Sequence, residues 1–224
     1  MESLSATSTE GILVDLCSVL ILLSAFACLG SKLFDRYVAY YAVQSMVLAV
    51  AAGTVAYHFR ATDLWVLAVL TLAIKGIGIP LVTRRLLLTR LDLKRDAALA
   101  LGLSTTLILG ALLTAFAYLV IGPRVLPTGA VAVAVIPLST AVILLGGLAM
   151  VVRRHTIAQL FGWLIVENGV FLAAITLVAT FPFIVEAGIF LDLVAAVLIM
   201  LALVSGIAHR LAAARASELR GLRG

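Results

Sequence analysis

Three ionisable side chains lie inside long apolar runs of this sequence: Lys75 in "TLAIKGIGIP", Glu167 in "FGWLIVENGVFLA" and Asp192 in "EAGIFLDLVAAVLIM". A charged side chain at the centre of a bilayer costs about 2.5–3.5 kcal/mol on insertion scales, and such groups commonly serve ion paths or proton relays. A carboxyl group or an amine in a partly hydrated interior can take up and release protons. The three residues are therefore candidates for a proton or ion path.

The surroundings of Lys75 differ from those of an ordinary apolar helix. Gly76 and Gly78 allow another backbone to approach closely. Pro80 has no N–H to donate to the carbonyl of Gly76, which predicts a kink and a free carbonyl beside the lysine. The structural alternative is that Lys75 extends its amine to the inner membrane surface. Arg85 marks that surface about 15 Å further along the helix, which makes the alternative less favourable.

Each carboxyl group also has a structural alternative. Glu167 could be a neutral acid that hydrogen-bonds a neighbouring helix and only holds the two together. Glu186 is interpreted as a boundary residue at the outer end of the last apolar run, and Asp15 as an interfacial residue near the start of the first. Lys75, Glu167 and Asp192 remain the groups that are hardest to explain structurally.

The composition places these residues in a membrane protein. The chain has 224 residues, of which 64% are hydrophobic and 12% are charged, and a mean hydropathy of +1.23. A soluble domain has about half apolar and a quarter charged residues. Because a helix needs about 20 apolar residues to cross a bilayer, we predict seven spans. They cover residues 11–30, 38–58, 64–84, 97–121, 129–152, 157–180 and 184–208.

The basic residues predict the orientation of these spans. Most of the sixteen lysines and arginines fall in loops on one side: Lys32, Arg36, Arg84, Arg85, Arg90, Lys94, Arg95, Arg153, Arg154, Arg210, Arg215, Arg220 and Arg223. Only Arg60 and Arg124 fall on the other side. The positive-inside rule then predicts an N-terminus outside and a C-terminus inside. The net charge of +5 does not indicate nucleic-acid binding, because the basic residues form no continuous stripe or arm.

An internal repeat relates the two halves of the chain. A shift of 123 residues superimposes the first three spans on the last three, so that Gln44 falls opposite Glu167 and Asp63 opposite Glu186. We predict one all-α membrane domain over 1–224, with parallel repeats at about 11–84 and 129–208 and a joining helix at 97–121. Repeats often build a conduction site at their interface. The predicted path therefore comprises Glu167, Lys75, Asp192, Gln44 and Glu186.

The sequence offers no pattern for a cofactor or a metal. The three histidines lie at span ends, which leaves no buried pair for a haem. Cys17 and Cys28 lie on one predicted helix about 16 Å apart, too far to form a disulfide with each other. We therefore expect no cofactor, no metal site and no bond chemistry in this chain.

Several of these segments together resemble hydrogenase-4 component E, a family of membrane subunits of group 4 NiFe hydrogenases such as formate hydrogenlyase-type complexes. They are "YVAYYAVQSMVLAV", "LTLAIKGIGIPLVTRRL", "RRHTIAQLFGWLIVENGVFLAA" and "EAGIFLDLVAAVLIM". The last three spans also resemble the small K component of respiratory complex I and the corresponding C component of cation/proton antiporters. Glu167 matches the acid in the middle of the second helix of the K component. Asp192 or Glu186 would match a further acid in its third helix, and Lys75 has no match.

The resemblance implies a non-catalytic subunit in the membrane arm of a complex I-like oxidoreductase. Its partners would be antiporter-like membrane subunits and lipid, and it would lie in the inner membrane. The basic stretch from Arg84 to Ala98 could bind anionic lipid or a soluble NiFe and iron–sulfur arm. Gly146 and Gly147 could pack against partner helices. The alternatives are a subunit of an antiporter, a stand-alone transporter, or a structural scaffold.

Overall fold

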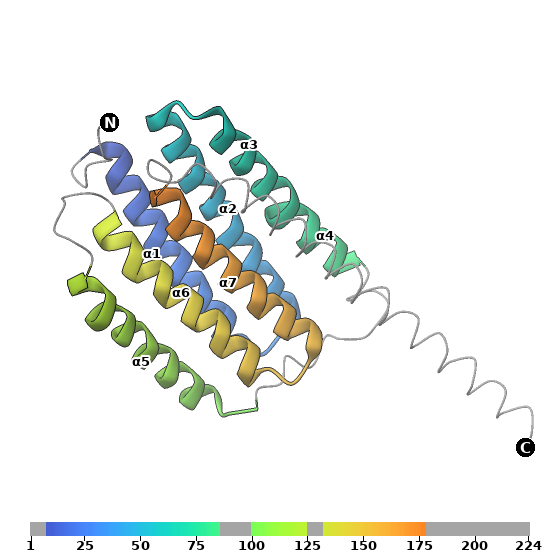
Figure 1. The fold of residues 1–224 in the computed structure, drawn as a ribbon. Coiled ribbons are helices and arrows are strands. Elements are labelled where there is room, and N and C mark those ends of the chain that lie inside the picture. The colour runs from blue at the N-terminus through green and yellow to red at the C-terminus, as the bar shows by residue number, and fades with distance from the viewer. Residues whose placement is uncertain (1–7, 86–99, 125–131, 178–224) are drawn as a thin grey trace, which may run out of the picture.

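The computed structural model of the chain describes residues 8–85, 100–124 and 132–177, and every element in these ranges is helical (Figure 1). The long helices are α1 (Thr9–Gly30), α2 (Phe34–Phe59), α5 (Leu103–Ile121), α6 (Ala132–Val152) and α7 (Thr156–Leu177). A further span, Thr62–Thr83, is built from α3 (Thr62–Thr71), the π-helix η1 (Leu72–Gly78) and α4 (Ile79–Thr83). A short 3₁₀ turn, Gly122–Arg124, follows α5.

Six of these helical segments are long and apolar enough to cross a membrane, so the chain is a multi-pass membrane protein. They correspond to the first six predicted spans. The predicted seventh span, 184–208, lies outside the described residues, together with Asp192 and Glu186. Most of the basic stretch from Arg84 to Ala98 also lies outside them.

The predicted start of the fourth span, at residue 97, is wrong, because α5 begins at Leu103. The residue before it, Gly102, has an extended backbone (φ −59°, ψ 148°). Slightly earlier, the backbone N–H of Ala100 donates to the carbonyl of Val152 at 2.7 Å, which ties this segment to the end of α6. Hydropathy extends across "LALGL" without a break, whereas in the structure residues 100–102 precede the helix and Ala100 is hydrogen-bonded to the end of α6.

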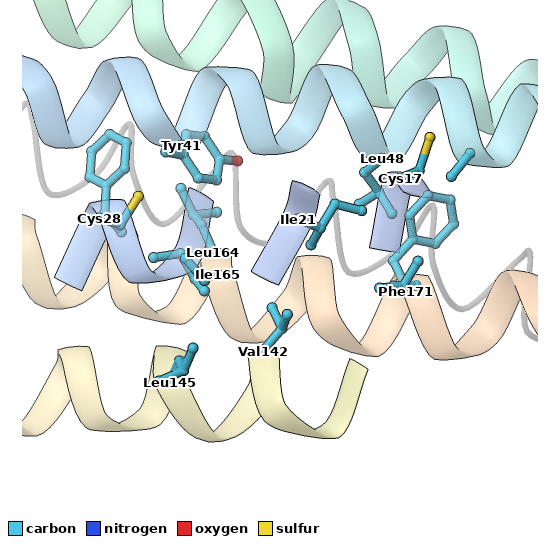
Figure 2. Packing of buried hydrophobic residues seen from close by; sticks show 14 of the residues in the cluster. Cys17, Ile21, Cys28, Tyr41, Leu48, Val142, Leu145, Leu164, Ile165 and Phe171 are labelled. Carbon is cyan, nitrogen blue, oxygen red and sulfur yellow. The ribbon is translucent and has the colours of Figure 1, made fainter. Parts of the chain in front are cut away.

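The helices α1, α2, α6 and α7 form the centre of the bundle (Figure 1). The α3–α4 span packs on α2 at one edge, and α5 packs mainly on α6 at the other. Large apolar side chains from the four central helices fill the space between them; Figure 2 shows Ile21, Leu48, Val142 and Ile165 among them. In contrast, α5 has only three buried residues, namely Thr106, Gly110 and Ala117. It is therefore a peripheral helix.

The contact between α6 and α7 depends on glycine. A Cβ atom added at Gly146 would lie 2.6 Å from the backbone nitrogen of Val166, and one at Gly162 would lie 2.9 Å from that of Met150. Small residues let helix backbones approach closely in membranes. The prediction that Gly146 packs against a partner helix is thus wrong, because this glycine is used inside the chain. At Gly147 an added Cβ atom would meet nothing within 4 Å.

The two adjacent glycines provide a test of this packing. We expect Gly146→Ala to lower the midpoint of thermal unfolding clearly, since the new methyl group would collide with backbone rather than with a flexible side chain. Overpacking of this kind typically costs about 1–3 kcal/mol. Gly147→Ala is the matched control and should be neutral or slightly stabilising. Equal effects of the two variants on the purified chain in detergent would contradict the packing described here.

Arg153 connects the end of α6 to the end of α1. It was predicted to lie in a basic loop beside Arg154, yet its side chain is buried with 1% exposure. One guanidinium nitrogen donates to the carbonyls of Cys28 (2.8 Å) and Leu29 (3.1 Å), in the last turn of α1, and the guanidinium lies 4.8 Å from the centre of the Tyr37 ring. A cation at this position stabilises the negative end of a helix and pairs with the face of an aromatic ring.

Burial lowers the pKa of the Arg153 guanidinium, while the neighbouring Tyr37 and Cys28 oppose that shift. We expect Arg153→Ala to lower the free energy of unfolding by about 3 kcal/mol, since two charge-assisted hydrogen bonds and a buried contact are lost. Arg154 is exposed, so Arg154→Ala should change the free energy by less than about 0.5 kcal/mol. Chemical unfolding in detergent would measure both. If Arg153→Ala lowers the free energy of unfolding no more than Arg154→Ala does, the buried contacts of Arg153 do not stabilise the chain.

A candidate charge site in the membrane interior

The third span carries a π-helical segment, Leu72–Gly78, with Lys75 at its centre. The kink predicted beside Lys75 stays a prediction; the irregularity described here is the π-helical segment, with Pro80 in the first turn of α4. A π-helical segment is wider than an α-helix and often occurs at functional sites. Gly76 allows α2 to approach, since a Cβ atom there would lie 3.3 Å from Cγ of Met46.

Lys75 forms an ion pair with Glu167 of α7, in which Nζ lies 3.3 Å from Oε2. Only 1% of the lysine side chain and 4% of the glutamate side chain are exposed. The interpretation that Lys75 extends to the membrane surface is therefore wrong. Both residues lie near the middle of 22-residue helical spans. The pair is thus placed in the interior of the bundle, away from either end.

A chain of hydrogen bonds surrounds this ion pair. Nζ of Lys75 donates to Oδ1 of Asn168 (3.4 Å), and Nδ2 of Asn168 donates to Oε1 of Gln44 (3.2 Å) and Oγ of Ser45 (3.2 Å). Nε2 of Gln44 in turn donates to the backbone carbonyl of Ile21 (3.1 Å). The chain joins α1, α2, α7 and the third span.

The direction of these bonds follows from the charge on Lys75. An ammonium group can only donate, so the amide of Asn168 must present its oxygen to the lysine and its nitrogen to Gln44. Asn168, Gln44 and Ser45 are fully buried. Buried polar groups are costly without partners, and a connected network holds them in one arrangement. The network therefore fixes the position of Lys75 relative to Glu167.

An isolated charge in this place would be far more costly than the pair. Removal of one partner from a buried ion pair typically destabilises a protein by about 3–5 kcal/mol, because an uncompensated charge remains. Replacement of both partners by apolar residues is often neutral. A gain in stability therefore does not explain why a Lys–Glu pair lies among apolar helices. The chemistry that this arrangement can perform is to hold or transfer a proton.

The structure brings together three of the five predicted path residues, Lys75, Glu167 and Gln44. The remaining two, Asp192 and Glu186, lie outside the described residues. Asn168 and Ser45 were not predicted, although each directly follows a predicted residue. Under the 123-residue shift Ser45 falls opposite Asn168, and this relation could have identified both. Asp15, interpreted as interfacial, lies near the start of α1 and is partly exposed.

An apolar groove of about 530 Å³ lies near the pair but does not contain it. It runs between α1, α2 and α3, from Glu10, Tyr57 and Trp65 at one end to Met46 and Leu72 beside the π-helix. Neither Lys75 nor Glu167 lines it. The charge site is therefore enclosed by helices in the described part of the chain and is separate from this groove.

Comparison with known proteins identifies relatives that match most of the chain. It is 27% identical to hydrogenase-4 component E of Escherichia coli and of Shigella flexneri over 195 residues, which are 87% of this chain and 90% of that protein. The chain is a homologue of hydrogenase-4 component E. It is also 29% identical to the uncharacterised protein Rv0085 of Mycobacterium tuberculosis over 152 residues, or 68% of this chain and 69% of that protein. No protein-family model and no solved structure matches.

The match to hydrogenase-4 component E must include the charge site. Of 224 residues 195 are matched, which leaves 224 − 195 = 29 outside. Every position from 30 to 195 therefore lies within the matched range, including Gln44, Lys75 and Glu167. The resemblance inferred from the sequence is thus confirmed at low identity.

Proposed function

We propose that this chain is a membrane-arm subunit of a complex I-like, group 4 hydrogenase-type oxidoreductase. In this role it performs no bond chemistry of its own. Its buried charges form part of a proton or sodium path that is coupled to electron transfer elsewhere in the complex. The homology to a hydrogenase component supports membership of a multi-subunit membrane complex.

The observation that carries the proposal is the ion pair between Lys75 and Glu167 in the bundle interior. Two titratable groups in contact share their protons as a unit, so a charge that moves nearby can make the pair release or take up a proton. A scaffold would need only the apolar contacts of these helices. An intramembrane ion pair that is held by an amide network is typical of a translocation path.

The proposal includes the predicted repeat of three helices. Several contacts support it, because they join positions that the 123-residue shift makes equivalent. Asn168 contacts Ser45, and α1 packs on α6 just as α2 packs on α7. A contact between equivalent positions is expected at a two-fold axis. The charge network would then lie on the axis that relates the two halves.

The proposal also includes seven spans in the inner membrane, with the N-terminus outside and the C-terminus inside. The uneven distribution of lysine and arginine supports this orientation. Asp192 and Glu186 in the last span would extend the path, as would contact with antiporter-like subunits. The basic stretch that follows Arg84 would then face the soluble arm or the lipid of the inner leaflet.

Purification from native membranes tests this function directly. A tagged chain, extracted in mild detergent, should co-purify with antiporter-like membrane subunits, a NiFe large subunit and an iron–sulfur subunit. An unrelated tagged membrane protein of similar abundance is the control. Recovery of antiporter subunits alone would contradict the link to a redox arm, and recovery of an isolated monomer would contradict membership of any complex.

A further inference from the structure

Two threonines on the third span, Thr71 and Thr83, are fully buried, yet their hydroxyl groups have no hydrogen-bond partner within the described structure. Threonine in a helix usually donates to the carbonyl four residues earlier. Thr54, Thr106, Thr114 and Thr140 all do so here, at 2.9–3.0 Å. Thr71 and Thr83 thus depart from the pattern of this chain.

A buried hydroxyl group without a partner costs about 1–3 kcal/mol, and ordered water is a common explanation. The two threonines share a buried face of their span with Lys75. Thr71, Lys75, Ile79 and Thr83 recur every four residues, and all are at least 93% buried. One unpartnered hydroxyl group therefore lies about one helical turn before the lysine, and the other about two turns after it.

The four residues Thr71, Lys75, Ile79 and Thr83 form a stripe along the third span, and this stripe ends at the exposed end of the span beyond Thr83. The next residue, Arg84, pairs with Asp35 at the start of α2, with 3.2 Å between Nε and Oδ1. The side chains of this pair are 48% and 57% exposed. Along this face polar groups therefore occur at the exposed ion pair, at Thr83 and at the interior pair of Lys75 and Glu167, with the apolar Ile79 between Thr83 and Lys75.

We propose that the buried face of the third span is a hydrated proton path to the charge site. Water bound at Thr83 connects the Asp35–Arg84 end to the pair of Lys75 and Glu167, and water bound at Thr71 continues the path beyond it. This inference rests on the proposed function, and it specifies the route and the ion.

The chemistry of the stripe selects protons rather than sodium. A hydroxyl group both donates and accepts hydrogen bonds, so it can pass a proton between two waters. A hard metal cation needs several oxygen ligands at one point. The described stripe offers isolated hydroxyl groups separated by helical turns, and an ammonium group between them that would repel a metal cation.

Threonine-to-valine substitutions test the path, because they keep the side-chain shape and remove the hydroxyl group. In inverted vesicles that contain the intact complex, Thr83→Val and Thr71→Val should each slow proton uptake by about tenfold, which corresponds to the loss of one hydrogen-bonded station. Thr83→Ser and Thr71→Ser should restore it. Thr106→Val is the matched control, because Thr106 is equally buried but donates to its own helix. It should stay within about twofold of the wild-type rate.

Accessibility to a water-soluble thiol reagent provides a second test that does not depend on activity. In an intact complex whose chain carries Cys17→Ala and Cys28→Ala, Thr83→Cys and Thr71→Cys should react, because thiol modification requires water at the site. Thr106→Cys should not react. A pair of unreactive cysteines at 71 and 83 would overturn the hydrated path.

The outcomes separate this inference from the proposed function. Wild-type uptake in both valine variants, together with lost uptake in Glu167→Gln, would overturn the route and leave the function of the pair intact. If Glu167→Gln also keeps wild-type uptake, the result overturns both the hydrated route and the proposed role of the Lys75–Glu167 pair. Sodium-dependent uptake that is unaffected by proton uncouplers would overturn the choice of proton as the ion.

Discussion

Glu167→Gln should leave the subunit in the membrane complex and reduce coupled ion uptake by at least about a hundredfold, the usual effect of removing a positioned acid–base group. Glutamine keeps the shape of glutamate and much of its hydrogen-bonding capacity, but it cannot bind or release the proton. It can still accept a hydrogen bond from Lys75, whose Nζ also donates to Asn168. Uptake into inverted vesicles, with the amount of each subunit checked in the same membranes, measures the effect.

Two further variants serve as comparisons for Glu167→Gln. Glu167→Asp keeps a carboxyl group but moves it by about one methylene, so its uptake should fall between those of the wild type and Glu167→Gln. Asp63→Asn makes the same change of chemistry at an exposed carboxylate at the start of α3, and it should retain normal uptake. If Glu167→Gln keeps full coupling at normal subunit levels, Glu167 is a structural residue.

Lys75→Met should destabilise the chain by about 3–5 kcal/mol, because it leaves the carboxylate of Glu167 buried without its cation. The double variant Lys75→Met/Glu167→Gln should recover most of that loss, since neither charge remains. Ion uptake should nevertheless be lost in both variants. Chemical unfolding of the purified chain in detergent measures the first effect, and vesicle uptake measures the second.

The recovery in the double variant separates a pair from two independent residues. Residues that do not interact have additive effects, whereas residues in contact deviate from additivity by about 0.5–3 kcal/mol. Substitution of an exposed apolar residue on the same span, Val69→Leu, is the control and should not interact with Glu167→Gln. Additive losses at Lys75 and Glu167 would contradict the ion pair.

The six described spans could be predicted from the sequence because the bilayer sets a length and a polarity that every crossing helix must meet. The start of α5 could not, since a hydropathy pattern does not record the hydrogen bond from Ala100 to Val152. The sequence likewise does not show which of the adjacent glycines Gly146 and Gly147 packs against another helix. Adjacent residues on a helix point about 100° apart, so Gly146 faces α7 whereas Gly147 meets open space, and the two are alike in sequence.

The charge site was predictable in part. Lys75 and Glu167 could be recognised because a charge in a bilayer is costly wherever its helix packs. That the two are partners depends on how their helices associate, and a single sequence contains no such information. Neutral polar residues such as Asn168 and Ser45 cost much less in an apolar run, so they did not stand out. Arg153 was missed because a basic residue at a span end is normally an exposed loop residue.

The ion pair also has a consequence for how the protein is made. Lys75 precedes its hydrogen-bond partner Asn168 by 93 residues. At a synthesis rate of about 5–20 residues per second, the interval between synthesis of the third span and synthesis of α7 is on the order of 5–20 s. During that interval the lysine has no Glu167 to neutralise it. A nascent chain that stops after its first half would therefore carry an uncompensated charge at the centre of a membrane helix.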